Sequence, residues 1–176
     1  MTTDSSRSFP RARVKKVRER AAPDAISLAQ THNAARIRPL LEAAGFLTVG
    51  LDHPGICVIA ATRNAEVIGV VAVETIVDCA LMRSLFVTPS MRRRGIGTRL
   101  VAAARAAAVT RGARTLYTLA DAAAAPFLAR CGFGAADYRA ALDELSGCPL
   151  ADYLQTHRGP ALAWKLDVSA DGIINR

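Results

Sequence analysis

The sequence predicts an α/β fold (α+β, with a mixed sheet) in which helices cover both faces of about six to seven strands. Its 176 residues fit one hydrophobic core, because single cores usually serve about 100 to 200 residues. Hydrophobic residues make up 51% of the chain and charged residues 22%, which is typical of a packed domain. After residue 80 a strand, an Ala-rich helix and a second strand follow one another, and this order implies a parallel pair with a right-handed crossover.

Each element is predicted from its own pattern. Runs rich in Val, Ile or aromatic residues between turn residues predict strands over Ala25–Gln30, Ile56–Thr62, Glu66–Thr75, Ala80–Thr88, Arg114–Ala120, Phe133–Arg139 and Ala161–Val168. The second and third of these are separated by three residues and should form a hairpin. Apolar residues at helical spacing predict helices over Asn33–Ala44, broken at Pro39, over Gly97–Arg111 and over Ala122–Cys131, with a helical turn at Leu142–Ser146.

The positive charge is concentrated at the N-terminus. Residues 1–23 hold seven Arg and Lys side chains against two acidic ones, whereas the whole chain has a net charge of +8. This segment has neither interleaved aromatic residues nor an RNA-binding motif, so a solvated, poorly ordered arm is favoured over a nucleic-acid-binding segment. We therefore expect a basic arm over 1–23 and one domain over 24–176.

The sequence also indicates a compartment. The longest uncharged aliphatic stretch, Val67–Val73, is far shorter than the roughly 18 residues that a bilayer span needs, and no signal-peptide pattern is present. The four cysteines are scattered without a CxxC pair, which favours reduced, buried thiols and argues against a metal site. These features predict a cytoplasmic protein without a metal or a membrane partner.

The segment from Leu85 to Thr98 joins a strand to a helix and carries the clearest chemical signal. A helix start presents unpaired N–H groups and positive dipole charge, and Gly95 and Gly97 let an anion approach that backbone closely. Three arginines, Arg92 to Arg94, precede them. The spacing matches neither the Walker loop nor the dinucleotide fingerprint, so the pattern predicts a different phosphate site, with a solvated basic loop as the alternative.

These residues resemble the GCN5-related N-acetyltransferase (GNAT) superfamily, whose acetyl-CoA signature [R/Q]xxGxG/A is matched by Arg92, Gly95 and Gly97. A second family block, A-x-x-F-x-x-x-x-G-F, is matched by Ala124, Phe127, Gly132 and Phe133. The resemblance covers roughly residues 25 to 168. Short strings, namely Gly69-Val70-Val71 before Glu74, Leu81 to Leu85, and Cys148-Pro149, are similar to the subgroup linked with arsenic-resistance operons.

The resemblance implies transfer of an acetyl group from acetyl-CoA to an amine by direct attack on the thioester, without a metal. It implies that a β-strand edge receives the pantetheine arm and that a helix start receives the pyrophosphate. The implied cofactor-binding residues are Leu85, Phe86, Val87, Arg92, Arg93, Arg94, Gly95, Ile96, Gly97, Thr98, Asp121, Ala124, Phe127 and Arg130. A backbone N–H near Phe86 or Val87 would meet the oxyanion. Family members often form homodimers, and the strand around Trp164 is where we expect subunits to pair.

The general acid is an open question. The family frequently has a Tyr directly after the helix Phe, to protonate the departing thiolate, and this chain has Leu128 there. Tyr117 or Tyr138 could replace it, although a packed tyrosine is the more common environment for either residue. A thiol with a pKa of about 8.5 is also a tolerable leaving group without prior protonation.

The candidate base and the candidate acceptor-binding residue are charged residues within aliphatic strands. Glu74 is the candidate base, with a solvent-facing strand end as the alternative. Arg83 either pairs internally, with Glu74 or Asp78, or holds an anionic group of the substrate. The weak base machinery favours an α-amine, whose pKa near 8 needs less help than that of a lysine, or another weakly basic amine.

The sequence therefore predicts an N-acetyltransferase acting on a small, anionic, amino-acid-like amine, with arsenical or amino-acid-analogue detoxification as a role. The alternative is a non-catalytic acetyl-CoA-binding regulatory module, because the usual acid is missing. Nucleic-acid association has only the basic arm and the pI of about 10.0 in its favour.

Overall fold

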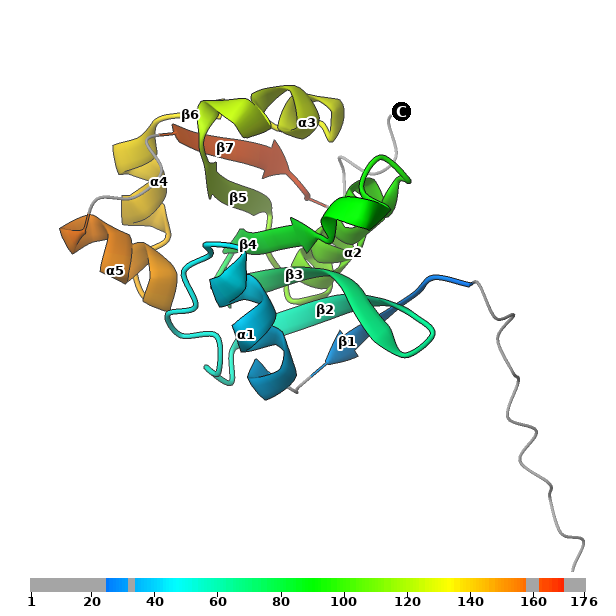
Figure 1. Cartoon of the computed structure of the whole chain (residues 1–176). Helices are drawn as coiled ribbons and strands as arrows, with labels where there is room; N and C mark the ends of the chain where they lie inside the picture. The colour runs from blue at the N-terminus through cyan, green and yellow to red at the C-terminus, as the bar shows by residue number, and fades with distance from the viewer. Residues whose placement is uncertain (1–24, 32–33, 158–161, 170–176) are drawn as a thin grey trace, which may run out of the picture.

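The computed structural model describes residues 25–31, 34–157 and 162–169 (Figure 1). The basic segment 1–23 and Asn33, the predicted helix cap, lie outside the described residues. Seven strands are formed: β1 (Ser27–Thr31), β2 (Ile56–Arg63), β3 (Glu66–Ile76), β4 (Cys79–Val87), β5 (Thr115–Ala120), β6 (Gly134–Ala136) and β7 (Leu162–Asp167). The α-helices are α1 (Ala34–Ala43), α2 (Ile96–Thr110), α3 (Ala125–Arg130), α4 (Tyr138–Glu144) and α5 (Pro149–Thr156), with 3-10 turns η1 (Pro89–Met91) and η2 (Ala122–Ala124).

The strands form one mixed sheet in the order β1-β2-β3-β4-β5-β7-β6. The pair β4–β5 is parallel, from Cys79 beside Thr115 to Met82 beside Thr118, and the other neighbours are antiparallel. Both the predicted hairpin and the predicted parallel pair are therefore confirmed. The strand around Trp164, β7, lies between β5 and β6, so both of its backbone edges are used within the sheet.

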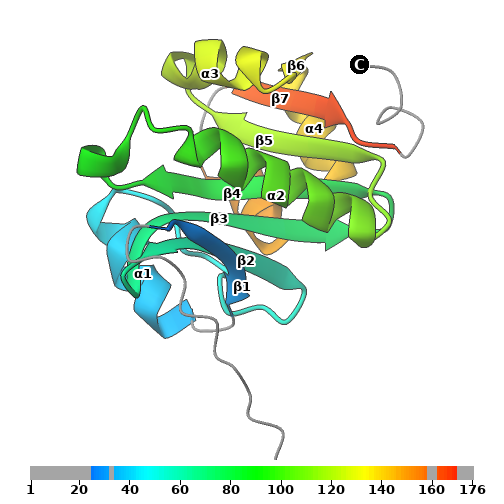
Figure 2. The same cartoon turned by 90° about the vertical axis from the view of Figure 1, so that its right-hand side faces the viewer.

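Helices cover both faces of the sheet, as predicted (Figures 1 and 2). On one face α2 packs Leu100 and Ala104 against alternate strand residues such as Val71 and Val73. On the other face two separate apolar clusters form. One is built under α1 around Ile37 and Leu41, and the other under α4 and α5 around Leu81 and Tyr117.

The largest departures from prediction lie after residue 133. The expected strand Phe133–Arg139 is only three residues long, because Asp137 caps a helix that begins at Tyr138 by accepting a hydrogen bond from the Ala140 N–H at 2.8 Å. The helical turn predicted at Leu142–Ser146 is the end of that helix, α4. Helix α5 was not predicted. Its sequence has Pro at the first helical position and buries Leu150 and Leu154 four residues apart.

Helix α1 runs without a break through Pro39, contrary to the predicted interruption. Ile37 and Leu41 on either side are 1% and 0% exposed, so their burial offsets the hydrogen bond that proline cannot donate. None of the helices in the described part of the chain is long and apolar enough to cross a membrane.

The segment between α1 and β2 crosses the gap between the two apolar clusters and packs against the start of α5. Arg38 of α1 donates to the Thr48 carbonyl at 3.3 Å and pairs with the Asp52 carboxylate. Gly50 has φ +65, and a Cβ there would lie 2.4 Å from the Cβ of Pro149. The segment can approach α5 this closely because residue 50 has no side chain.

Gly50→Ala is expected to destabilise the fold by at least about 2 kcal/mol, since both left-handed strain and a steric overlap follow. Gly134→Ala is the matched control, because a Cβ at residue 134 meets nothing within 4 Å, and its effect should stay within about 0.5 kcal/mol. Denaturant unfolding of both variants measures the difference, and equal stabilities would contradict the packing described.

Candidate functional site

An opening in the sheet between β4 and β5 is the centre of the candidate site. The two strands pair only as far as Met82 and Thr118, although β4 continues to Val87. The β3–β4 register shifts by one residue between Val70 and Ala72, so β4 holds one extra residue there. Ser84, at this bulge, has φ +55. The bulge coincides with the point where pairing stops, and no strand among the described residues pairs with the β5-facing edge of β4 beyond it.

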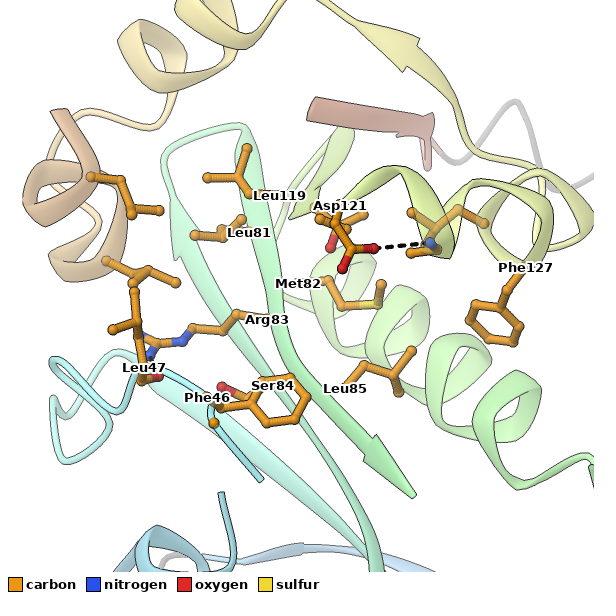
Figure 3. A pocket seen from close by; sticks show the side chains of 17 residues that line it. Phe46, Leu47, Leu81, Met82, Arg83, Ser84, Leu85, Leu119, Asp121 and Phe127 are labelled. Carbon is orange, nitrogen blue, oxygen red and sulfur yellow. Dashed lines mark hydrogen bonds between the residues drawn. The ribbon is translucent and has the colours of Figure 1, made fainter. Parts of the chain in front are cut away.

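A cleft of about 540 Å³ occupies this opening (Figure 3). Leu85, Phe127 and Leu128 line it and belong to the cluster on the α2 face of the sheet. Leu119 and Leu154 line it and belong to the cluster under α4 and α5 on the opposite face. The cleft therefore passes through the sheet and joins its two faces.

The helix α2 begins beside the α2-face end of the cleft. Gly95 is its N-cap with φ +75, and Arg93 before it also has positive φ, 58°. The first-turn N–H groups of a helix have no partner within the helix, and Ile96, Gly97 and Thr98 supply them here. Such a turn, at the positive end of a 15-residue helix, is a suitable site for a phosphate group.

The predicted cofactor residues gather around this end. Gly97 packs against Phe127, since a Cβ at residue 97 would lie 3.4 Å from the ring. Arg92 donates from Nε to the Val87 carbonyl at 3.1 Å and is exposed, like Arg93 and Arg94. The Ile96 side chain is buried in the core, so its backbone alone is available to a ligand.

Of the four cofactor-binding residues predicted after β5, three line the cleft and one does not. Asp121, Ala124 and Phe127 line the cleft, and Asp121 Oδ1 accepts from the Ala124 N–H at 3.2 Å. Arg130 is exposed on α3 and does not line the cleft.

Arg83 and Glu74 form a buried ion pair on the opposite face of the sheet. Arg83 Nη1 lies 2.5 Å from Glu74 Oε1, and the two side chains are 2% and 3% exposed. Arg83 also donates from Nη1 to the Val49 carbonyl and from Nη2 to the Leu47 carbonyl, each at 2.6 Å. The predicted internal pair of Arg83 with Glu74 is therefore formed. It ties the segment after α1 to β4.

The structure does not bring Glu74 into the cleft. The alternative prediction, a strand end that faces solvent, is wrong, because Glu74 is 2% exposed. Glu74 lines a separate cavity of about 40 Å³ beside Cys148. Its Oε1 atom accepts a hydrogen bond from Arg83 Nη1. The geometry therefore gives no support to Glu74 as the base and indicates a role in holding Arg83.

Neither candidate tyrosine lines the cleft. The hydroxyl of Tyr117 points into the α4–α5 side, where it donates to Glu144 Oε2 at 2.6 Å. Burial and the Glu144 carboxylate raise the pKa of Tyr117 well above its ordinary value. Tyr138 lies on α4 and packs against the same cluster. Leu128 does line the cleft, so an apolar side chain occupies the position where the family often has a tyrosine.

The cysteines show no sign of a reactive or metal-binding site. Burial, and then the negative charge of Glu74, raise the pKa of the Cys148 thiol, which keeps it protonated. Within the described ranges no group of three or more His, Cys, Asp or Glu side chains could hold a metal ion.

Sequence reasoning missed the wall of the cleft that comes from the segment after α1 and from α5. Phe46 and Leu47 line the cleft from the first, and Leu150 and Leu154 line it from the second. Phe46 is held by an edge-to-face contact with Phe86, at a centroid separation of 6.2 Å. The spacing of Leu150 and Leu154 was a readable signal for a helix, whereas nothing in the sequence links the first segment to the cleft.

Comparisons with known proteins agree with this geometry. A model of the acetyltransferase (GNAT) family matches residues 14–133, a range that begins within the basic segment. No match was found among curated proteins.

Solved structures with the same fold include enzymes of that family. A GNAT-family acetyltransferase from Staphylococcus aureus aligns with a TM-score of 0.63 and 11% identity, over 82% of this chain and all of that one. N-acetylglutamate synthase from Neisseria gonorrhoeae, complexed with coenzyme A and N-acetyl-glutamate, aligns with a TM-score of 0.63 and 25% identity. The alignment covers 84% of this chain but 36% of the synthase, so this chain corresponds to about a third of that protein.

Glu74→Ala is expected to lower the free energy of unfolding by about 3 to 5 kcal/mol, because it leaves the Arg83 charge buried without its partner. Glu42→Ala is the control. It removes an exposed carboxylate 3.9 Å from Arg38 and should cost no more than about 1 kcal/mol. Denaturant unfolding distinguishes the two variants. A Glu74→Ala protein as stable as the control would contradict a structural role for the pair.

Proposed function

Because this chain belongs to the acetyltransferase (GNAT) family, we propose that it transfers an acetyl group from acetyl-CoA to the amine of a small, anionic, amino-acid-like acceptor. The observation that carries the proposal is the cleft through the sheet, which has an unpaired β4 edge and a helix start at one side and Arg83 at the other. Acetyl-CoA would enter from the α2 face and the acceptor from the face of α1 and α5.

The residues at the α2 face suit the parts of acetyl-CoA. The free edge of β4 around Leu85 offers backbone groups to the amides of the pantetheine arm, as an added strand would use them. The α2 start offers N–H groups to the pyrophosphate, and Arg92 to Arg94 add positive charge beside it. Main-chain atoms thus do most of the binding, and the residues needed are the glycines that expose them.

The reaction would be direct. The amine nitrogen attacks the thioester carbonyl carbon, a C–N bond forms and the C–S bond breaks. The amine gives its proton to water, and the thiolate takes a proton from water after it has left. Since no tyrosine of the described residues lines the cleft, coenzyme A would leave as the thiolate, which a thiol pKa near 8.5 allows. An α-amine with a pKa near 8 is the acceptor that needs least help from a base.

Two observations support an amino-acid-like acceptor. Arg83 lines the acceptor side of the cleft, and three of its five guanidinium N–H groups donate to Glu74, Val49 and Leu47. The N–H of the buried Nε atom, which has no hydrogen-bond partner among the described residues, and the second N–H of Nη2 are left for a substrate anion. The structure of the gonococcal synthase holds N-acetyl-glutamate, an acetylated amino acid, and that protein is 25% identical over 84% of this chain. A role in detoxifying arsenical or other amino-acid analogues rests on the sequence resemblance alone.

The test is release of coenzyme A thiol from acetyl-CoA with amino acids, their phosphonate and arsenical analogues, polyamines and a lysine peptide. The proposal expects turnover with acceptors that combine an α-amine and an acidic group, and little with polyamines. Turnover with polyamines alone would overturn the acceptor assignment. Binding of acetyl-CoA in calorimetry without turnover on any acceptor would favour the regulatory module.

Gly97→Ala is the variant arm of that assay. The added Cβ makes ordinary contact with Phe127, and alanine is the better helix former by about 1 kcal/mol, so the fold should not lose stability. The same methyl group stands where the pyrophosphate must approach the helix start. The Km for acetyl-CoA should therefore rise about tenfold or more while thermal stability is kept, and an unchanged Km would contradict the assigned phosphate site.

A further inference from the structure

The acceptor side of the cleft is lined almost entirely by apolar side chains (Figure 3). They come from three places in the chain: the segment after α1, the strands β4 and β5, and helix α5. The residues are Phe46, Leu47, Leu81, Leu119, Leu150 and Leu154. Figure 3 shows Leu47 beside the Arg83 side chain and Leu81 and Leu119 above it, on the side of the cleft opposite to Phe127. We call this half of the cleft the leucine chamber.

Few polar groups are available in the leucine chamber. Among the described residues that line the cleft, Arg83 and Asp121 are the two with charged side chains. Asp121 belongs to the other half and already accepts a hydrogen bond from the Ala124 N–H. The hydroxyl residues Ser84 and Thr118 stand at the opening between the strands, at the bulge and at the last β4–β5 pair.

Most of the hydrogen-bonding capacity of Arg83 is already used within the protein. Its Nη atoms donate to Glu74 Oε1 and to the carbonyls of Leu47 and Val49, so the charge is compensated within the protein. The capacity that remains suits one carboxylate of a ligand and leaves nothing for a second polar group. A further carboxylate or amide of the acceptor would be buried without a hydrogen bond, which is unfavourable.

We propose that the acceptor is an α-amino acid with an apolar side chain, such as leucine, methionine or phenylalanine. This inference rests on the proposed function for the reaction, and it adds the class of side chain. The α-carboxylate would meet Arg83, the α-amine would face the opening between β4 and β5, and the side chain would fill the leucine chamber. Acidic and amide side chains would be discriminated against by about tenfold to a hundredfold.

The experiment measures binding and turnover separately. Calorimetry of the full chain loaded with coenzyme A compares leucine, methionine and phenylalanine with glutamate and glutamine, and thiol release is measured on the same set. At least tenfold tighter binding of the apolar amino acids is expected. Equal or tighter binding of glutamate or glutamine, or no binding of any of the five, would overturn the chamber assignment. Apolar binding without turnover would instead contradict the proposed reaction and leave the chamber supported.

Two variants test whether the leucine chamber causes the preference for apolar side chains. Leu154→Asn adds an amide to its wall and should reduce the ratio of methionine to glutamine binding at least fivefold. Leu142→Asn is the control, because Leu142 is buried to 3% exposure against 4% for Leu154, in the same cluster, and does not line the cleft. Its ratio should match that of wild type. A ratio that shifts in both variants, or in neither, would contradict the assignment, and the wild-type series decides if the variants do not fold.

Discussion

One extra residue in β4 determines the arrangement of the site. The bulge at Ser84 lies where β4 stops pairing with β5, and the opening that results is the cleft through the sheet. Before the bulge, Met82 faces α2 and Leu81 faces α5, as in any strand. After it, Leu85 faces α2 and Phe86 faces α1. The bulge therefore exposes backbone on one strand edge while both faces of the sheet stay packed.

The second constraint is the buried pair Arg83–Glu74. It lies between the apolar clusters under α1 and under α4–α5, and neither cluster extends across it. The guanidinium reaches two carbonyls of the segment after α1, which crosses this gap and reaches α5 at Gly50. A buried charge pair adds little net stability, but it defines where this segment must lie. The position of Phe46 and Leu47 at the cleft depends on it.

The cofactor side of the site could be predicted from the sequence, whereas the acceptor side could not. The glycines and arginines from 92 to 97 are local in sequence, and a strand followed by a helix start places them with no further information. Glu74 was assigned to the wrong environment because its partner is nine residues away across a hairpin, and the carbonyls that complete the network lie in a distant segment. A local sequence pattern predicts that a side chain is buried only where residues nearby in the sequence bury it.

The same reason explains the misassigned elements. Asp137 caps α4 and was a readable signal, but the short apolar run before it was extended too far as a strand. Most of the sheet was correctly predicted, because its strands are runs rich in Val, Ile or aromatic residues between turn residues.

In the proposed complex acetyl-CoA lies along the free edge of β4 and on the start of α2. Amide hydrogen exchange with and without coenzyme A tests it most directly. Protection is expected within residues 85–87 and 94–98, with no change in the edge strand β1. Protection confined to other segments, or none within 85–87, would contradict the account.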